Sequence, residues 1–147
     1  MLTTDGRRSF ELSGPVAAAV GLGLAVVLLA PAPFLSDLAV FQFLAVQLGF
    51  IAAVYFGFAV ADGRIGPLAL EFLVAGSFMF LGTTALWADS PALLASGYAA
   101  HAVWDLVHHP RAVTSRVASW YPPFCVVFDL AVAAFILLWL PLGGVAA

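Results

Sequence analysis

Apolar residues run along this chain in five long stretches, and the polar residues gather in the short segments between them. A membrane-spanning helix needs about 20 mostly apolar residues. The connecting segments are rich in Gly, Pro, Asp and Ser, which favour turns and helix starts. The pattern therefore predicts an all-α, polytopic transmembrane helical bundle, a single domain over residues 1–147, with spans near residues 14–33, 38–60, 65–87, 91–109 and 122–140.

The composition agrees with a membrane protein. The chain is 64% hydrophobic and 9% charged, whereas soluble domains are roughly half apolar and about a quarter charged. A formal net charge of -3 does not favour a nucleic-acid partner. The single cysteine, Cys125, excludes a disulfide within the chain. We expect membrane lipids as partners and an apolar small molecule as the candidate substrate, and a homo-oligomer stays open.

The basic residues predict an orientation. All five are arginines, and in the predicted topology they fall on one side of the membrane: Arg7, Arg8, Arg64, Arg111 and Arg116. By the positive-inside rule this side is cytoplasmic, which places the N-terminus in the cytoplasm and the C-terminus outside. In an alternative interpretation, RRSFEL, the apolar run and APAP form a cleaved signal peptide. Cleavage would leave four helices with the same sidedness.

The stretch HAVWDLVHH, residues 101–109, contains every histidine of the chain. Because each residue of an α-helix advances by about 100 degrees, four ionisable side chains share one face: His101, Asp105, His108 and His109. Charge that faces lipid is unfavourable, so this face is predicted to point into the bundle. Two acids on neighbouring spans, Glu71 and Asp129, lie at a similar depth, about 9–10 Å from the arginine side.

Buried acids beside imidazoles favour mutual neutralisation, a metal ion or a proton path. A metal ion explains the most residues at once, because His101 and Asp105, four residues apart, can share one ion. His101 and His108 are about 10.5 Å apart along the helix axis, so one helix supplies two or three ligands. We predict metal ligation by His101, Asp105, His108 and His109, with Glu71 and Asp129 as catalytic carboxylates that complete this site or build a second one. Nitrogen and oxygen ligands suit zinc, iron or manganese.

Structural roles compete with these assignments. His108 and His109 can be interfacial residues at a helix C-terminus, and His101 with Asp105 can be a buried hydrogen-bonded pair. Glu71 and Asp129 can be protonated and bonded to a neighbouring helix, and Cys125 can be a small buried hydrophobe. Asp62 and Asp89 fall in loops, and Trp104 is interpreted as a packing residue or a residue of the interfacial aromatic belt. Other polar residues are expected to form interhelical hydrogen bonds: Gln42, Gln47, Tyr55, Thr83 and Thr84.

The motifs HAVWDLVHHPR and SWYPPFCVVFDL resemble those of a family of small bacterial multi-span membrane proteins of unknown function. The resemblance covers the C-terminal third and implies the bacterial inner membrane as the location. It marks His101, Trp104, Asp105, His108, His109, Tyr121, Pro122, Pro123, Cys125 and Asp129. The histidine stripe is also similar to the histidine boxes of membrane di-iron hydroxylases and desaturases, and to the His and Asp sets of intramembrane zinc hydrolases such as alkaline ceramidases. The desaturase type carries many more histidines than this chain.

The leading hypothesis is an intramembrane metal site that faces the cytoplasm and serves a metal-dependent hydrolase or oxidase acting on a lipid-like substrate. In the hydrolytic version, Glu71 or Asp129 acts as general base. A second hypothesis is a proton or metal-ion conduit without catalytic activity. A third is a haem or pigment-binding subunit with His101 as axial ligand.

Overall fold

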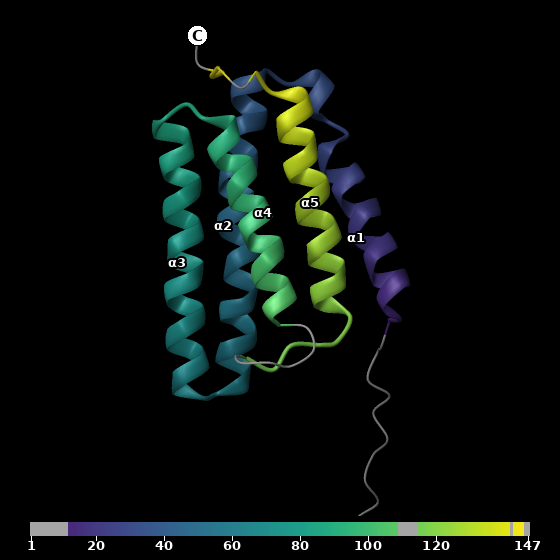
Figure 1. Cartoon of the computed structure of the whole chain (residues 1–147), viewed down its shortest axis with the longest axis vertical. Coiled ribbons are helices and arrows are strands. Elements are labelled where there is room, and N and C mark those ends of the chain that lie inside the picture. The colour runs from purple at the N-terminus through teal and green to yellow at the C-terminus, as the bar shows by residue number, and fades with distance from the viewer. Residues whose placement is uncertain (1–11, 109–114, 142, 146–147) are drawn as a thin grey trace, which may run out of the picture.

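The computed structural model describes residues 12–108, 115–141 and 143–145. This part of the chain folds into five α-helices and one short 3-10 turn, η1 (Ala32–Phe34), and it contains no strand. The α-helices are α1 (Gly14–Leu29), α2 (Asp37–Asp62), α3 (Ile65–Trp87), α4 (Pro91–Val107) and α5 (Tyr121–Trp139) (Figure 1). The predicted all-α fold is therefore confirmed.

Four helical segments are long and apolar enough to cross a membrane: α1 together with η1, α2, α3 and α5. The remaining helix, α4, has 17 residues, whereas a span needs about 20. It nevertheless runs alongside the long helices in the bundle (Figure 1). The chain thus has the architecture of a membrane protein, with one shorter helix packed among its spans.

The helix ends follow from local sequence. The third span begins and ends where predicted, at Ile65 and Trp87. The first was expected to reach residue 33 but ends at Leu29, because the prolines at positions 31 and 33 lack the N–H that would continue the helix. At the start of α2 the Ser36 side chain accepts a hydrogen bond from the Ala39 N–H, and at its end Gly63 adopts a φ of 74°, which favours glycine.

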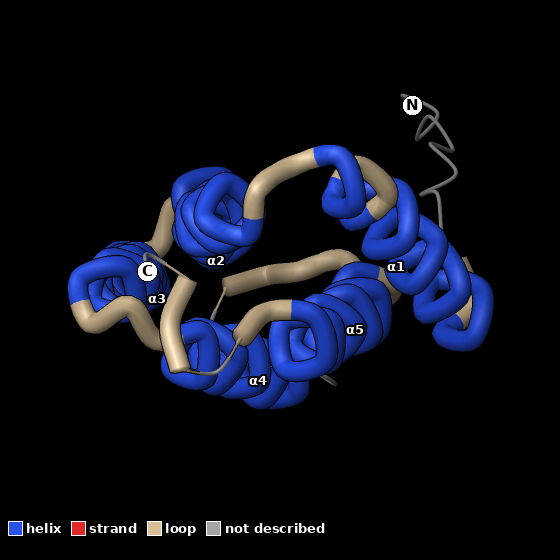
Figure 2. Tube along the Cα trace, turned by 90° about the horizontal axis from the view of Figure 1, so that it is seen from above, coloured by secondary structure: helices blue, strands red, loops and turns tan. Residues whose placement is uncertain are grey.

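The helices pack as two hairpins and one additional helix. α2 pairs with α3, α4 pairs with α5, and α1 lies against the far side of α5 (Figure 2). α4 also contacts α3 and α2, so it joins the two hairpins. Residues on α4 are therefore placed where side chains from both hairpins can meet.

Two glycines allow the helices to approach closely. A Cβ atom on Gly21 of α1 would collide with the Phe124 carbonyl of α5, and one on Gly82 of α3 would lie 2.8 Å from the Ala45 carbonyl oxygen of α2. Small residues of this kind let transmembrane helices pack backbone against backbone. They fix where α1 crosses α5 and where α3 crosses α2.

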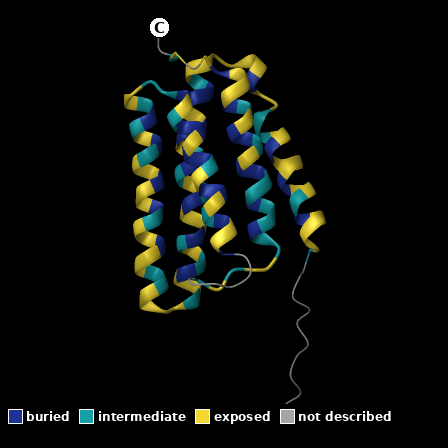
Figure 3. Cartoon of the chain, in the orientation of Figure 1, coloured by how far each residue is buried: buried dark blue, intermediate teal, exposed yellow. Residues whose placement is uncertain are grey.

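Burial divides the interior into an apolar half and a polar half. The apolar half contains buried residues such as Leu44, Leu94, Val132 and Ile136. Exposed positions run along the outer sides of the helices (Figure 3), and many of them are large apolar residues, as expected where the surroundings are lipid. The buried acidic and histidine residues in the described part of the chain are Glu71, His101, Asp105, His108 and Asp129. They lie toward the end of the bundle that contains Gly63, Arg64 and residues 115–120, which we call the arginine end.

Candidate metal centre

Three of the predicted site residues converge in the interior. His101 and Asp105 lie on α4 and Asp129 lies on α5, and one ligand atom from each lies within 4.8 Å of the others. His101 Nδ1 is 2.7 Å from Asp129 Oδ2 and 3.6 Å from Asp105 Oδ2. No side chain of the three is more than 1% exposed. We call these residues the His–Asp–Asp group.

Each member of the His–Asp–Asp group has one polar atom without a hydrogen-bond partner among the described residues. These atoms are His101 Nε2, Asp105 Oδ2 and Asp129 Oδ1. A buried polar atom left without a partner costs about 1–3 kcal/mol, and more when it is charged. A divalent cation would compensate the two carboxylates, and one imidazole with two carboxylates is a donor set that suits zinc, iron or manganese. The residues present therefore fit a metal ion.

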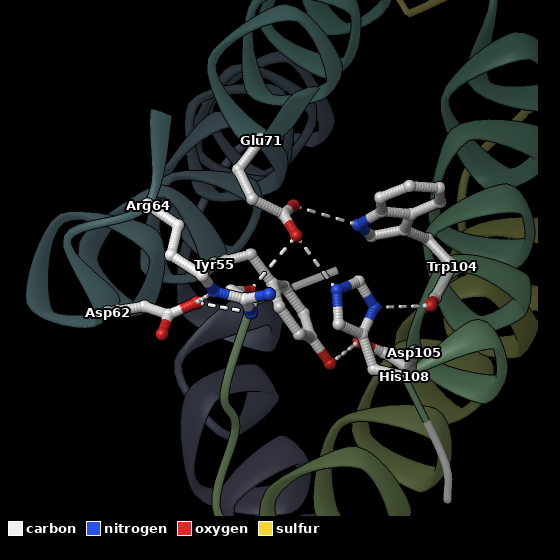
Figure 4. A network of polar contacts seen from close by, with 8 residues as sticks. Tyr55, Asp62, Arg64, Glu71, Trp104, Asp105 and His108 are labelled. Carbon is white, nitrogen blue, oxygen red and sulfur yellow. Dashed lines mark hydrogen bonds and ion pairs between the residues drawn. The ribbon is translucent and has the colours of Figure 1, made fainter. Parts of the chain in front are cut away.

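Tyr55 connects this group to the other hairpin. Tyr55 lies on α2, and its hydroxyl donates a 2.7 Å hydrogen bond to Asp105 Oδ1 (Figure 4). Its ring lies 5.9 Å from the His101 ring and 4.3 Å from the His108 ring, measured between centroids. The hydrogen bond holds one oxygen of Asp105 and leaves the other on the side of His101. The interhelical hydrogen bond predicted for Tyr55 is thus confirmed.

A second polar cluster joins Glu71 of α3 to His108 (Figure 4). His108 Nε2 is 2.9 Å from Glu71 Oε1, and His108 Nδ1 is 3.0 Å from the Trp104 carbonyl oxygen. Glu71 also accepts hydrogen bonds from Trp104 Nε1 at 3.3 Å and Ser115 Oγ at 3.1 Å. Because a carbonyl oxygen only accepts, Nδ1 must carry a proton, and the three donors around Glu71 favour a carboxylate paired with an imidazolium.

The structure divides the predicted site residues. His101, Asp105 and Asp129 form one group, whereas Glu71 and His108 form a separate pair, because His101 and His108 stand two helical turns apart, about 10.5 Å. Asp129, expected as a catalytic base, lies among the candidate ligands. His109 falls outside the described residues, as do Arg7, Arg8 and Arg111.

Comparison with protein families matches residues 14–142 to a family of unknown function, DUF6010. The chain belongs to this family. The match extends over all five helices of this DUF6010 member, and so over both polar clusters. Searches of curated proteins and of solved structures found no match. The resemblance to histidine-box metalloenzymes stays a prediction.

Several polar residues have partners that the sequence did not predict. Trp104, interpreted as a packing residue, donates to Glu71. Asp62, assigned to a loop without a role, closes α2 and binds Arg64 and Arg116 at the arginine end. At the opposite end, Asp89 accepts a 2.9 Å hydrogen bond from the backbone N–H of Val145. The sequence around an acidic residue at a helix end does not indicate which distant residues it will contact.

The interhelical hydrogen bonds predicted for Thr83 and Thr84 are wrong. Their hydroxyls donate to carbonyls one turn earlier on their own helix, those of Met79 and Phe80. This is the common alternative for a threonine inside a helix. Gln42 and Gln47 likewise make no interhelical side-chain hydrogen bond to the described residues. Cys125 is buried but is not among the residues of the His–Asp–Asp group.

Proposed function

We propose that this protein is a membrane-embedded, metal-dependent hydrolase that acts on a lipid-like substrate. A divalent cation would be held by His101, Asp105 and Asp129. The observation that carries the proposal is the convergence of one ligand atom from each of these three buried residues within 4.8 Å. Each residue also has a buried polar atom without a hydrogen-bond partner among the described residues. A purely structural hydrogen-bond network would be expected to pair them.

The number of ligands favours catalysis over a structural role. Structural zinc sites are usually closed by four protein ligands, whereas catalytic sites use three and keep a position for water or substrate. Among the described residues, the group contains three candidate ligands. A cation bound there would supply an activated water at neutral pH. An oxidase of the di-iron type needs further carboxylates around a second ion, and Glu71 is already paired with His108.

The surrounding residues have separate tasks in this proposal. Tyr55 holds Asp105 through its hydroxyl, and the Asp129–His101 hydrogen bond holds the imidazole in a fixed orientation. Glu71 belongs to the neighbouring pair with His108 and would hold α3 against the end of α4 beside the site. These contacts join both hairpins at one site.

The substrate class follows from the location. Glu71 lies six residues into α3, about 9 Å from the arginine end, and His108 at the end of α4 reaches the same level. His101 lies six residues before the end of α4, so the His–Asp–Asp group lies about 9 Å deeper still. The outer surface around this depth is apolar, with exposed side chains such as Phe72 and Leu73 on α3. A substrate that reaches this site would come from the membrane itself, which favours a lipid or a similarly apolar molecule.

The structure argues against the two alternatives. A conduit needs polar groups toward both ends, but the described core between Tyr98 and the opposite end contains buried Leu94, Val132 and Ile136. A haem needs open space beside its axial histidine, but the His101 ring packs between Tyr55 and Phe78, at 5.9 and 4.9 Å between centroids.

Metal analysis tests the binding claim. Detergent-purified wild type is exposed to zinc, iron or manganese, dialysed, and analysed by inductively coupled plasma mass spectrometry, beside His101→Ala and Asp105→Asn. The matched control is Asp37→Asn, which removes an exposed carboxylate in the first turn of α2. Near-stoichiometric metal in wild type and control, lost from both site variants, is expected. A folded, metal-supplemented wild type without metal would overturn the proposal.

Lipid turnover tests the catalytic claim. The metal-loaded protein is incubated with a membrane lipid extract, and hydrolysis products are measured by mass spectrometry. We expect products that disappear on chelation and in Asp129→Asn. Metal binding without any lipid product would support the metal site but refute the proposed hydrolase activity.

A further inference from the structure

Two exposed arginines meet on one buried carboxylate at the arginine end. Arg64 donates from Nε and Nη2 to Asp62 Oδ2 at 2.9 and 2.6 Å, and Arg116 Nε lies 3.6 Å from Asp62 Oδ1. The Asp62 side chain is 1% exposed, whereas those of Arg64 and Arg116 are 53% and 85% exposed. A buried anchor therefore holds two guanidinium groups at the surface. The hydrogen bonds to Asp62 raise the pKa of Arg64, which keeps this guanidinium charged.

The charge and position of this arginine pair fit a lipid phosphate. Two guanidinium groups and one carboxylate leave one positive charge, which a phosphodiester would neutralise. Guanidinium N–H groups match phosphate oxygens in geometry as well as charge. The pair lies where two apolar helices long enough to span a membrane meet, since α2 ends at Asp62 and α3 begins at Ile65. At the end of a span, the nearest abundant anions are lipid headgroups.

Aromatic residues at the same end of the bundle also indicate that the arginine pair lies at the level of the lipid headgroups. Trp120 and Tyr121 stand at the start of α5, at the same end of the bundle, with ring centroids 5.6 Å apart. Both are partly buried. Tryptophan and tyrosine gather at the headgroup level of membrane proteins.

We propose that Arg64 and Arg116 bind the phosphate of an anionic membrane lipid. The binding itself does not depend on the metal. The identification of this lipid with the substrate rests on the proposed function, and it narrows the substrate class to a phosphate-bearing lipid ester.

The same segment connects the arginine pair to the buried site. Ser115, next to Arg116 in sequence, donates to Glu71, which lies about 9 Å into α3. The polar region of a bilayer is about 5–8 Å thick on each side of the hydrocarbon. A lipid with its phosphate on the arginine pair would therefore carry its ester groups down to the level of Glu71, and its acyl chains deeper, toward the level of the His–Asp–Asp group.

Native mass spectrometry tests this binding. The protein is equilibrated in detergent with equal amounts of phosphatidylglycerol and phosphatidylcholine that carry the same acyl chains, and the retained lipids are counted. We expect wild type to prefer phosphatidylglycerol. Arg116→Gln should lower this preference about five-fold, as expected for one arginine near a lipid surface. Because Arg116 is 85% exposed, this variant is expected to fold normally, which circular dichroism checks.

Asp62→Asn distinguishes lipid binding by the two arginines from a purely structural role of their ion pairs with Asp62. It removes the negative charge, so lipid recognition predicts an unchanged or stronger preference for phosphatidylglycerol. An equal loss in Asp62→Asn and Arg116→Gln would mean that the pair only holds the fold together, and would overturn the proposal. So would an unchanged preference in Arg116→Gln, or displacement of the lipid by excess inorganic phosphate, which would indicate a site for a soluble anion.

The metal content of the same samples keeps the two proposals apart. A wild type that prefers phosphatidylglycerol but binds no metal would support the lipid site and refute the hydrolase. Bound metal without any lipid preference would refute the lipid site alone.

Discussion

Replacement of Tyr55 by phenylalanine should be among the most damaging single-atom changes in the bundle. The substitution removes the 2.7 Å hydrogen bond to Asp105 and leaves Asp105 Oδ1 buried without a donor. A hydrogen bond to a charged group contributes about 1.5–3 kcal/mol, whereas interhelical hydrogen bonds in membrane proteins average about 0.6 kcal/mol. We expect the free energy of unfolding to fall by about 2 kcal/mol. Partners that orient a metal ligand change affinity by about 10–100-fold, so metal binding should weaken by a similar factor.

Tyr98→Phe is the matched control for this prediction. Tyr98 is also buried and donates a 2.8 Å hydrogen bond across helices, but its acceptor is the backbone carbonyl of Leu44. Its loss should cost about 0.5–1.5 kcal/mol and leave metal affinity unchanged. Unfolding in mixed micelles, followed by circular dichroism, measures the first quantity, and metal titration measures the second. A Tyr55→Phe protein as stable as Tyr98→Phe, with wild-type metal affinity, would refute the role given to Tyr55.

Two further predictions concern the polar pair and the helix crossing. Glu71→Gln should lower the free energy of unfolding by about 3–5 kcal/mol because it removes the carboxylate partner of the buried His108 side chain. Adding His108→Gln should restore more than half of this loss, and additive effects in this double-mutant cycle would contradict the ion pair. Gly21→Ala should destabilise by about 1–3 kcal/mol through collision with the Phe124 carbonyl. By contrast, Gly23→Ala, which has open space, should stabilise by up to about 1 kcal/mol. Equal effects of the two alanines on thermal unfolding would argue against the close crossing of α1 and α5.

The sequence predicted the helices and the face that His101 and Asp105 share on α4, because both depend on periodicity along one chain. Five helices form as expected, and α3 has the predicted bounds. The face shared by His101 and Asp105 is also as predicted, since it follows from helical geometry alone. These are local properties, and no tertiary information is needed for them.

The pairing of side chains between helices could not be predicted in the same way. The sequence predicted a similar depth for Glu71 and Asp129, but the rotation of each helix about its axis and its shift along the bundle decide which partner a side chain meets. That rotation is set by contacts such as Gly82 against the Ala45 carbonyl, which the sequence does not reveal. As a result Glu71 joined His108 and Asp129 joined His101, and the predicted site became two clusters.

The ligand set of the bound ion tests the central claim most directly, and X-ray absorption at the zinc edge of the zinc-loaded protein measures it. The account predicts only nitrogen and oxygen neighbours, at about 2.0–2.2 Å, with an imidazole signal that disappears in His101→Ala. A sulfur neighbour at about 2.3 Å would place Cys125 at the ion. Either that sulfur, or an imidazole signal that survives in His101→Ala, would contradict a site built from His101, Asp105 and Asp129.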